Sequence, residues 1–336
     1  MVGTAILGAG LISAAAAQDV QLRLHQFLPA QATLPTQVLK PWATELEEAS
    51  NGRIRITHFD SMSMGGRPQD LLDQARDGIA DISMAIIGYT PGRFPRSEVF
   101  ELPFIMAGPE PTARAFWDLV ESDLQDGEFR DLKVLAVWTH GPGAIHGTKP
   151  VRSLEDMQGQ KLRGPTRLIN DLLEELKAVP VAISLPETAE SLSKGVIDGT
   201  VISWEVVPSL RLAELVDYHT DFAGAEALYT TAIILVMNRA RYDALPDDLK
   251  AILDAHTGAD LSARAAVSMA EHDDLGREAA RAAGNEIILL DEAEVARWKA
   301  AAQPVYDRWF AEMERRDIDG SALVEQVRGL IASHQP

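Results

Sequence analysis

The chain has 336 residues, of which 50 are acidic and 31 are basic, so its formal net charge at pH 7 is −19. This negative charge argues against a nucleic acid as partner, because binding to a phosphate backbone requires clustered Lys and Arg. The absence of cysteine excludes disulfides, thiolate metal sites and cysteine nucleophiles. The length allows two domains of ordinary size.

The first 17 residues have the composition of a leader peptide. An apolar run extends from Ala5 to Ala17, Ala15 and Ala17 supply the small residues of a cleavage site, and charged residues begin only at Asp19. The basic residues that usually open a leader are missing, which indicates a clipped or misassigned start. We therefore expect residues 1–17 to be a signal peptide and the mature protein to be periplasmic.

The same stretch partly matches the glycine turn of dinucleotide-binding domains, through the letters GAG at residues 8–10. That turn needs a buried strand before it, a third glycine, and an acidic residue about 20 positions later. The third glycine position is Ser13, and the next strand candidate, residues 20–27, ends without an acid. The nucleotide alternative is therefore disfavoured. Since no later segment reaches 18 uninterrupted apolar residues, the mature protein is not expected to be embedded in a membrane.

Helix and strand patterns alternate along most of the chain. Apolar residues recur at helical spacing over 38–49 and stop at Gly52, and residues 53–57 then alternate like a strand. Further elements follow in chain order: helix 70–77, strand 79–87, strand 132–138, helix 167–178, strand 181–184, helix 187–194 and strand 196–203. This alternation predicts an α/β fold with parallel sheets covered by helices.

Two segments of the chain resemble each other. "RDGIADISMA" (76–85) and "SKGVIDGTVI" (193–202) share a helix end, a glycine, a β-branched residue, and an aspartate before a strand. A match of four positions is compatible with chance and equally with an internal duplication. A duplication would produce two similar α/β lobes.

The C-terminal third has a different composition. Residues 247–283 contain no proline and are rich in Ala, Leu and charged residues. They predict a helix of up to about 37 residues, about 55 Å long at 1.5 Å per residue, which is longer than one small lobe is wide. We therefore expect this helix to bridge two lobes. Asp291 with Glu294 predicts the start of a last helix, whose tryptophans are expected to pack in the core.

The sequence contains no recognised catalytic motif. The eight histidines are scattered, and the spacing of His140 and His146 fits neither a helical metal pair nor a known ligand motif. Neither a Gly-x-Ser-x-Gly, a P-loop nor a His-Glu-x-x-His motif occurs. We expect no metal, no cofactor and no catalytic residue. An exported hydrolase or lyase that uses Glu205 or His140 as acid or base stays open as the alternative, because triads are defined in space.

Residues suited to ligand recognition lie instead near predicted turns. "GQKLRGPTR" (159–167) puts Arg163 at the end of a short strand, where a guanidinium can pair with a carboxylate through two hydrogen bonds. The alternative for Arg163 is an exposed position on a turn. "GYTPGRFPRSE" (88–98) leaves a strand with Tyr89 in a proline-bracketed loop, which suits a rigid aromatic wall.

A third stretch, "ISWEVVPS" (202–209), places Trp204 and Glu205 where a strand ends. Ligands of open α/β sheets bind outside the carboxyl ends of strands, so the three stretches are expected to meet in one cleft. Glu205 would accept hydrogen bonds from ligand hydroxyls, or would pair with Arg163 or with Arg167. Arg167 is also expected among the ligand-binding residues, and Phe27, in the loop after the first strand, is included from its position.

The order of several segments resembles the periplasmic solute-binding proteins of tripartite ATP-independent periplasmic (TRAP) transporters, the DctP-like family. The likeness extends from about Leu22 to Gly284. It rests on "NGRIRI" (51–56), "GIADISMA" (78–85), "FELPFIM" (100–106), "VWTHG" (137–141), "SLEDMQGQKLRGP" (153–165), "LSKGVIDG" (192–199), "TTAIILVMN" (230–238) and "LPDDLKAIL" (245–253).

The resemblance implies a two-lobed periplasmic-binding-protein fold that closes over a small organic acid and delivers it to TRAP membrane permease subunits. In this chain, lobe I would comprise residues 18–141 and 229–262, and lobe II residues 142–228 and 263–336, with the helix 247–283 spanning both. Arg163 matches the family arginine that pairs with the ligand carboxylate.

The chain also departs from common members of that family. Many of them carry a second arginine in the strand after the "VWTHG" equivalent, where this chain has Gly143, and an Asn after the Asp-Gly where this chain reads "DGTVISWEVVP". These departures argue against a C4-dicarboxylate or sialic acid. Trp204 and Tyr89 suit a monocarboxylate that is aromatic or partly apolar, and Glu205 suits one that is hydroxylated.

Overall fold

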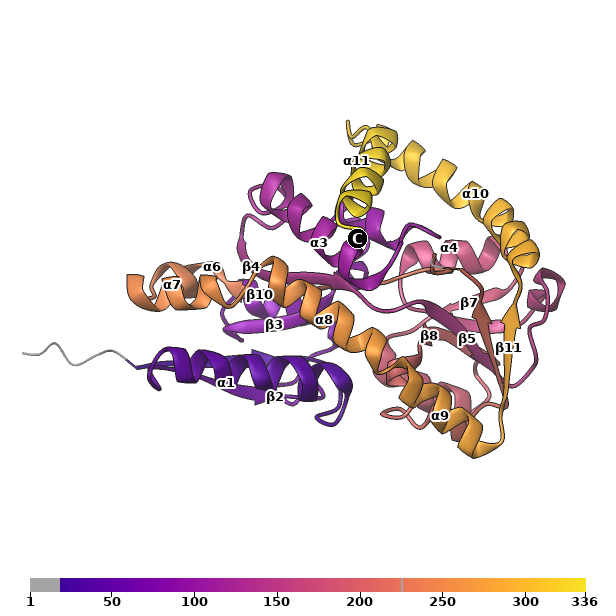
Figure 1. Cartoon of the computed structure of the whole chain (residues 1–336), viewed down its shortest axis with the longest axis horizontal. Helices are drawn as coiled ribbons and strands as arrows, with labels where there is room; N and C mark the ends of the chain where they lie inside the picture. Colours follow the sequence, from indigo (N-terminus) through magenta and orange to yellow (C-terminus); the bar gives the residue numbers. More distant parts are fainter. Residues whose placement is uncertain (1–18, 225) are drawn as a thin grey trace, which may run out of the picture.

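The protein consists of two α/β lobes, each built around its own sheet (Figure 1). The computed structural model describes residues 19–224 and 226–336, so the expected leader, residues 1–17, lies outside the described residues. Within these ranges, every helix is too short or too polar to span a bilayer.

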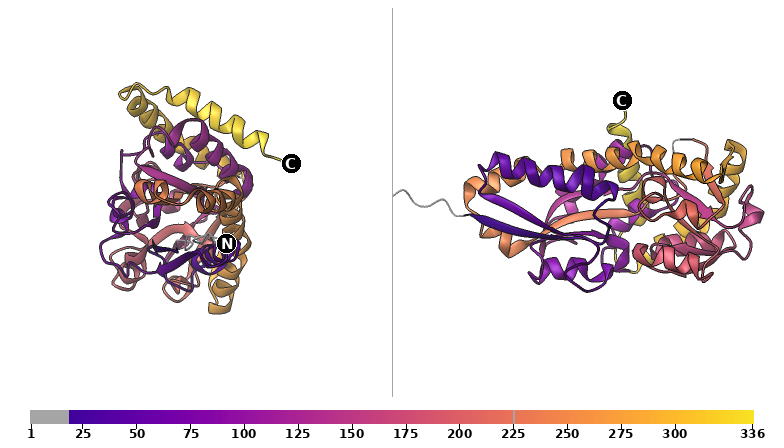
Figure 2. Two further views of the ribbon diagram at one scale, coloured as in Figure 1. Left: turned by 90° about the vertical axis from the view of Figure 1, so that its left-hand side faces the viewer. Right: turned by 90° about the horizontal axis from the view of Figure 1, so that it is seen from below.

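The sheet of lobe I has five strands in the order β2-β1-β3-β10-β4. Strands β1, β2 and β3 are parallel, whereas β10 runs antiparallel to both β3 and β4. In β1, outward and buried side chains alternate, while every residue of β3 is buried, because helices lie on both sides of the sheet (Figure 2). The bounds are β1 (Val20–His25), β2 (Ile54–Phe59), β3 (Ile82–Ile86), β4 (Leu132–Thr139) and β10 (Ala232–Asn238).

The sheet of lobe II has six strands in the order β11-β9-β5-β8-β6-β7. Strand β6 runs parallel to β7 and β8, whereas β5 is antiparallel to β8 and β9. The bounds are β5 (Gly143–Gly147), β6 (Lys161–Gly164), β7 (Val179–Ala182), β8 (Gly199–Ser203), β9 (Tyr218–Phe222) and β11 (Glu286–Leu290). The chain passes from the first sheet to the second between β4 and β5, and returns before β10.

The two segments that resemble each other in sequence also play equivalent structural roles. The carboxylate of Asp81 accepts a hydrogen bond from the backbone N–H of Arg23 at 2.8 Å, and that of Asp198 accepts one from the backbone N–H of Lys161 at 2.9 Å. In each lobe, the aspartate thus ties the start of one parallel strand to its neighbour. This equivalence favours internal duplication over chance.

Eleven α-helices surround the sheets in the described part of the chain. Their bounds are α1 (Lys40–Ala49), α2 (Leu71–Arg76), α3 (Pro109–Leu119), α4 (Arg167–Glu175), α5 (Thr188–Ser193), α6 (Arg239–Asp243), α7 (Asp247–Ala255), α8 (Ala259–Glu271), α9 (Asp273–Ala283), α10 (Glu292–Glu314) and α11 (Gly320–Ser333).

The long bridging helix expected over 247–283 is present as three successive helices, α7, α8 and α9. The first interruption ends at Gly258, which has a φ of +88° and donates its N–H to the carbonyl of Leu135 at 2.7 Å. Helix α8 packs against α3 and β4 of lobe I, and α9 packs against β11 of lobe II. The segment therefore connects the lobes as expected (Figure 1).

Helix α10 begins where the sequence predicts, because the side chain of Asp291 accepts a hydrogen bond from the backbone N–H of Glu294 at 2.9 Å. The assignment of the whole C-terminus to lobe II needs a correction. Helix α11 packs against α3 of lobe I, since its apolar face, including Leu323 and Val327, is buried there. The C-terminal helices thus lie over both lobes (Figure 1).

Candidate functional site

A small space is lined by residues of both lobes, and we call it the inner cavity. Its volume is about 40 Å³. Lobe I lines it through the loop after β1, the end of β3 and the start of β10, whereas lobe II lines it through the ends of β6 and β8. Most of the wall is apolar, formed by Phe27, Leu28, Leu34, Ile86, Leu185, Ile202, Val206, Ile233 and Met269.

Arg163, the last residue but one of β6, is the cationic group of the inner cavity and is only 2% exposed. Its Nε donates to the carbonyl of Ile183 at 3.0 Å, Nη1 to the carbonyl of Val201 at 3.3 Å, and Nη2 to the hydroxyl of Tyr89 at 3.4 Å. A guanidinium has five N–H groups, so further donors stay available. In the described part of the chain, no carboxylate forms a salt bridge with Arg163.

Two further polar side chains near Arg163 are already paired with each other. His140 Nδ1 lies 2.5 Å from the carbonyl of Gly141, and Nε2 lies 3.0 Å from the hydroxyl of Thr231. Because a carbonyl can only accept, Nδ1 carries the proton and Nε2 accepts from Thr231. Burial, aided by the positive charge of Arg163, lowers the pKa of His140 to about 4, so the ring is neutral at pH 7.

Tyr229 lines the inner cavity with a hydroxyl that has no hydrogen-bond partner among the described residues. The side chain is 1% exposed, and burial raises its pKa above the usual range. A buried hydroxyl without a partner is costly, so this group is suited to bond with a ligand. Tyr229 and Thr231 were not identified from the sequence. Their only signal was their position just before the strand that returns to lobe I.

Gly143, where the family resemblance leads one to expect a second arginine, has no room for a side chain. A Cβ atom built there would overlap the ring of Tyr229. The backbone N–H of Gly143 also donates to the carbonyl of Tyr229 at 3.2 Å. The aromatic ring of Tyr229 therefore occupies the space that a side chain at position 143 would need.

Glu205 provides a carboxyl group to the inner cavity and is 5% exposed. It lies in the 3₁₀ turn η8 (Trp204–Val206) that follows β8, where its Oε1 accepts a hydrogen bond from Ser203 at 3.1 Å. Burial and the nearby carboxyl of Asp273 raise its pKa to about 8. Glu205 pairs with neither Arg163 nor Arg167, so the alternative of an ion pair with either arginine is excluded in this structure.

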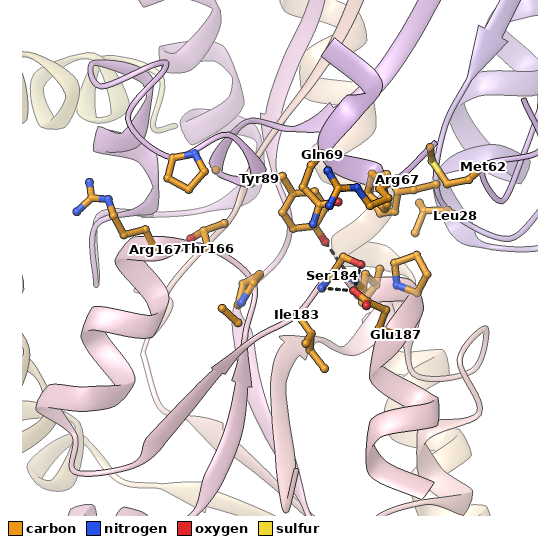
Figure 3. A pocket seen from close by; sticks show the side chains of 18 of the residues that line it. Leu28, Met62, Arg67, Gln69, Tyr89, Thr166, Arg167, Ile183, Ser184 and Glu187 are labelled. Atoms are coloured by element: carbon orange, nitrogen blue, oxygen red, sulfur yellow. Dashed lines mark hydrogen bonds between the residues drawn. The ribbon is translucent and has the colours of Figure 1, made fainter. Parts of the chain in front are cut away.

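A larger opening, which we call the outer cleft, lies beside the inner cavity and has a volume of about 1030 Å³ (Figure 3). Met62, Arg67 and Gln69 line it from lobe I, and Thr166, Ile183, Ser184 and Glu187 line it from lobe II. Phe27, Leu28, Pro165 and Leu185 line both spaces. These shared residues form the partition between the inner cavity and the outer cleft.

Arg167 belongs to the outer cleft rather than to the inner cavity. Its guanidinium forms salt bridges with Glu98 at 2.6 Å, with Glu312 at 3.0 Å and with Asp171 at 3.4 Å. Glu98 lies in the 3₁₀ turn η4 (Ser97–Glu101) of lobe I, whereas Arg167 begins α4 of lobe II. The Arg167 guanidinium therefore links the two lobes. It does not line the inner cavity, although the sequence led us to expect Arg167 among the ligand-binding residues.

Tyr89 lines the outer cleft and not the inner cavity, whereas Phe27 lines both spaces. The Tyr89 hydroxyl accepts hydrogen bonds from Arg163 and, at 3.0 Å, from the backbone N–H of Leu185. The ring of Phe27 meets that of Tyr89 edge-on, with the centroids 6.1 Å apart. Tyr89 thus carries a contact from lobe I to both Arg163 and the loop after β7 in lobe II.

Trp204 lines neither the inner cavity nor the outer cleft, in contrast to the expectation for it. The side chain is fully buried inside lobe II, where Nε1 donates to Asp221 at 2.6 Å and the ring packs against His146 and His219. Trp204 and Glu205 are consecutive residues of the turn η8, and successive side chains of a 3₁₀ turn point about 120° apart, so Glu205 reaches the inner cavity while Trp204 points into lobe II.

The described residues contain no cluster of three or more His, Asp or Glu side chains that could hold a metal ion. The polar groups of the inner cavity are a guanidinium, a neutral histidine, hydroxyls and a carboxyl group that is mostly protonated at pH 7. This set can bind an anion through Arg163 and enclose an apolar body.

Residues 25–313 match the family model DctP, described as bacterial extracellular solute-binding protein, family 7. Among solved structures, the chain is 41% identical to a TRAP solute-binding protein from Rhodoferax ferrireducens T118 in complex with copurified benzoate, with a TM-score of 0.92 over 94% of this chain and 98% of that one. It is 39% identical to a marine metagenome TRAP solute-binding protein specific for aromatic acid ligands, in complex with 3-hydroxybenzoate, with a TM-score of 0.92 over 95% and 100% of the two chains.

A more distant solved structure shares the same fold. The TRAP periplasmic solute-binding protein from Bordetella bronchiseptica, with bound (R)-mandelate and (S)-mandelate, is 27% identical to this chain, with a TM-score of 0.85 over 94% of this chain and all of that one. The match over most of the sequence and over both lobes confirms the family resemblance. The chain belongs to the DctP family of periplasmic solute-binding proteins of TRAP transporters, which are transport components and not enzymes.

Proposed function

We propose that this protein captures an aromatic monocarboxylate of the benzoate class in the inner cavity and delivers it to a TRAP membrane permease. The observation that carries the proposal is Arg163, a cation that is 2% exposed and has no carboxylate partner among the described residues. Burying an unpaired charge is unfavourable unless a counter-charge is supplied. A ligand carboxylate would supply it, with bidentate geometry that suits a guanidinium.

The number of available cations supports a ligand with one carboxylate. Arg163 is the only Arg or Lys among the lining residues of the inner cavity. Arg167, which lines the adjoining outer cleft, already has three carboxylate partners. A second ligand carboxylate would therefore have no cation to pair with.

The walls of the inner cavity support an aromatic or otherwise apolar body. Phe27, Ile86, Leu185, Ile202 and Met269 come from both lobes. Ligand pockets of this kind combine apolar walls with a few polar groups that fix orientation. The relatives that bind benzoate and 3-hydroxybenzoate, at 41% and 39% identity, are consistent with this substrate class.

The size of the inner cavity implies that the lobes move. A volume of about 40 Å³ corresponds to about three water molecules, which is less than a benzoate ion needs. Entry and accommodation of the ligand therefore require the lobes to separate, as in hinge-bending binding proteins. Family membership supports a membrane permease as partner, which would meet the protein after the lobes close over the ligand.

The hydrolase or lyase alternative loses its physical basis at the two residues on which it rested. His140 has both ring nitrogens in hydrogen bonds and is neutral at pH 7. Glu205 is hydrogen-bonded to the Ser203 hydroxyl, but its pKa is raised to about 8, so at pH 7 the carboxyl is mostly protonated and is not available as the base that a serine nucleophile needs.

Isothermal titration calorimetry of the mature protein with benzoate, 3-hydroxybenzoate, mandelate and succinate tests the proposal. We expect binding of the aromatic acids at micromolar or lower Kd, no binding of succinate, and no chemical change in the recovered ligand. Absence of binding by every aromatic acid, or preferential binding of succinate, would contradict the proposed substrate class.

A further inference from the structure

We propose that Glu205 and Ser203 form a second polar site in the inner cavity, which selects aromatic monocarboxylates that carry a hydroxyl group on the ring. This inference rests on the proposed function and deepens it. Arg163 would hold the carboxylate, and Glu205 would exchange a hydrogen bond with the hydroxyl. The ligand class becomes hydroxylated benzoates rather than benzoate itself.

Glu205 has the position that such a role requires. Its side chain is 5% exposed, lines the inner cavity and forms one side-chain hydrogen bond of suitable geometry in the described chain, from Ser203 at 3.1 Å. Ser203 also lines the inner cavity. The two residues present a carboxyl and a hydroxyl to the same space, so a ligand hydroxyl could both donate and accept there.

The turn that carries Glu205 is held in place from behind. The backbone N–H of Glu205 donates to the carboxyl of Asp273 at 3.0 Å. Helix α9 approaches so closely that a Cβ at Gly276 would overlap the carbonyl of Trp204. A polar group on a fixed backbone is oriented before the ligand arrives, which lowers the entropic cost of binding.

The Glu205 carboxyl and the Arg163 guanidinium line the inner cavity from different elements, the turn η8 and strand β6. No hydrogen bond or salt bridge joins them in the described part of the chain, since Arg163 donates to Ile183, Val201 and Tyr89 and Glu205 accepts from Ser203. The inner cavity therefore offers a ligand two polar groups that are not paired with each other. A rigid ring with substituents on different carbons can present one of them to each group.

The protonation state of Glu205 fits an uncharged partner. The charged and titratable groups that face it are Asp273 from α9 and, within the inner cavity, His140 and Arg163. Burial and Asp273 raise its pKa to about 8, so at pH 7 the carboxyl is mostly neutral and can donate a proton in a hydrogen bond. A neutral carboxyl does not repel the ligand anion. A second ligand carboxylate, in contrast, would meet the acidic side chain of Glu205, with Asp273 behind it, and no cation besides Arg163.

Calorimetric Kd values for benzoate, 3-hydroxybenzoate and 4-hydroxybenzoate, measured at pH 7 on the wild type and on variants, test the inference. We expect one hydroxybenzoate to bind about tenfold more tightly than benzoate to the wild type. Glu205→Met, which keeps the volume and removes the carboxyl, should abolish this preference while benzoate still binds. Glu205→Gln, which keeps a donor and an acceptor, should retain most of it.

The matched control is Glu101→Gln. Glu101 is as buried as Glu205 and its pKa is likewise raised to about 8, but it lines neither the inner cavity nor the outer cleft, so the preference should persist. Benzoate binding without any hydroxyl preference, or a preference that survives in Glu205→Met, would overturn the inference and leave the proposed function standing. A lack of binding by all three aromatic acids would overturn both.

Discussion

Arg163 and Arg167 lie four residues apart, yet their surroundings are opposite. Arg163 is 2% exposed and bonds only to two carbonyls and a tyrosine hydroxyl. Arg167 has a side chain that is 31% exposed and pairs with three carboxylates. Desolvation makes the charge of Arg163 the more costly of the two, although it has fewer compensating partners. The difference supports the proposal that Arg163 binds the carboxylate of a ligand.

The two arginines also differ in what they connect. Arg163 faces the inner cavity, where a ligand would complete its environment. Arg167 joins α4 of lobe II to Glu98 of lobe I and to Glu312 of α10, so its partners are all supplied by the protein. We infer that Arg163 determines affinity and that Arg167 contributes to the stability of the closed arrangement. Substitutions at Arg163, at Arg167 and at residues near them test this distinction.

The largest expected effect is that of Arg163→Met. Removing one partner of an enclosed charge pair costs roughly 2 to 5 kcal/mol, so the Kd for an aromatic acid should rise at least about 30-fold. The increase in melting temperature that the acid produces should disappear as well. Calorimetry and a thermal-shift assay measure these effects. An unchanged Kd would remove Arg163 from the site and with it the distinction between the arginines.

A second prediction concerns carboxyl groups that, like Arg163, are buried without an opposite charge beside them. Burial raises the pKa values of Glu101 and Glu205 to about 8, above their values in the unfolded chain. The folded protein therefore binds more protons than the unfolded chain, and stability falls as the pH rises from about 5 to 8. Each of the two carboxyl groups lowers the free energy of unfolding by on the order of 1 kcal/mol per pH unit over this range.

The buried histidines have the opposite effect at lower pH. Burial lowers the pKa values of His140 and His219 to about 4, so the unfolded chain binds more protons below pH 6.5 and stability falls as the pH drops from 6.5 to 4. Melting temperatures measured between pH 4 and 9 should thus decline from pH 6.5 to 8.5. Glu101→Gln should reduce that decline, whereas Glu48→Gln at an exposed position should not. A melting temperature that rises over this range would contradict the raised pKa values.

Gly143→Ala is expected to have a smaller effect on stability, and it tests what keeps a second side chain out of the inner cavity. A Cβ at this position would overlap the Tyr229 ring, and overpacking of this kind typically costs about 1 to 3 kcal/mol. The melting temperature should fall by several degrees, and ligand affinity should fall because Tyr229 lines the inner cavity. Adding Tyr229→Leu should recover part of the stability. A stable Gly143→Ala protein would mean that Tyr229 moves aside easily.

The fold could be predicted from the sequence because local patterns and the global topology agree. The strands expected over 53–57, 132–138 and 196–203 overlap β2, β4 and β8. One continuous helix was expected over 247–283, but the structure has breaks at Gly258 and near His272. These breaks were missed because the residues on both sides of each break have a composition that favours helix. Composition reports where a helix is favoured, whereas tertiary hydrogen bonds decide where it stops.

The site was less predictable because it depends on side-chain direction and on distant contacts. Trp204 and Glu205 are neighbours, but only Glu205 lines the inner cavity. Tyr229 was missed because its role arises from contact with Gly143, 86 positions earlier. Arg163 and Arg167 could not be distinguished from the sequence, because the carboxylates that pair with Arg167 come from η4 and from α10 as well as from its own helix.

The smallest expected effect is that of Arg167→Met. Of its three ion pairs, the one with Glu98 joins Arg167 to lobe I, and a partly exposed pair contributes about 0.2 to 1 kcal/mol, so the Kd should rise no more than about fivefold, mainly through faster ligand release. Stopped-flow measurement of release by displacement at low and high salt checks this, because salt should accelerate release from the wild type and have less effect on the variant. Glu98→Gln, which removes the partner on lobe I, should have a similar effect. A loss as large as that of Arg163→Met would show that Arg167 contacts the ligand, and the three carboxylates around it would then have to release it during binding.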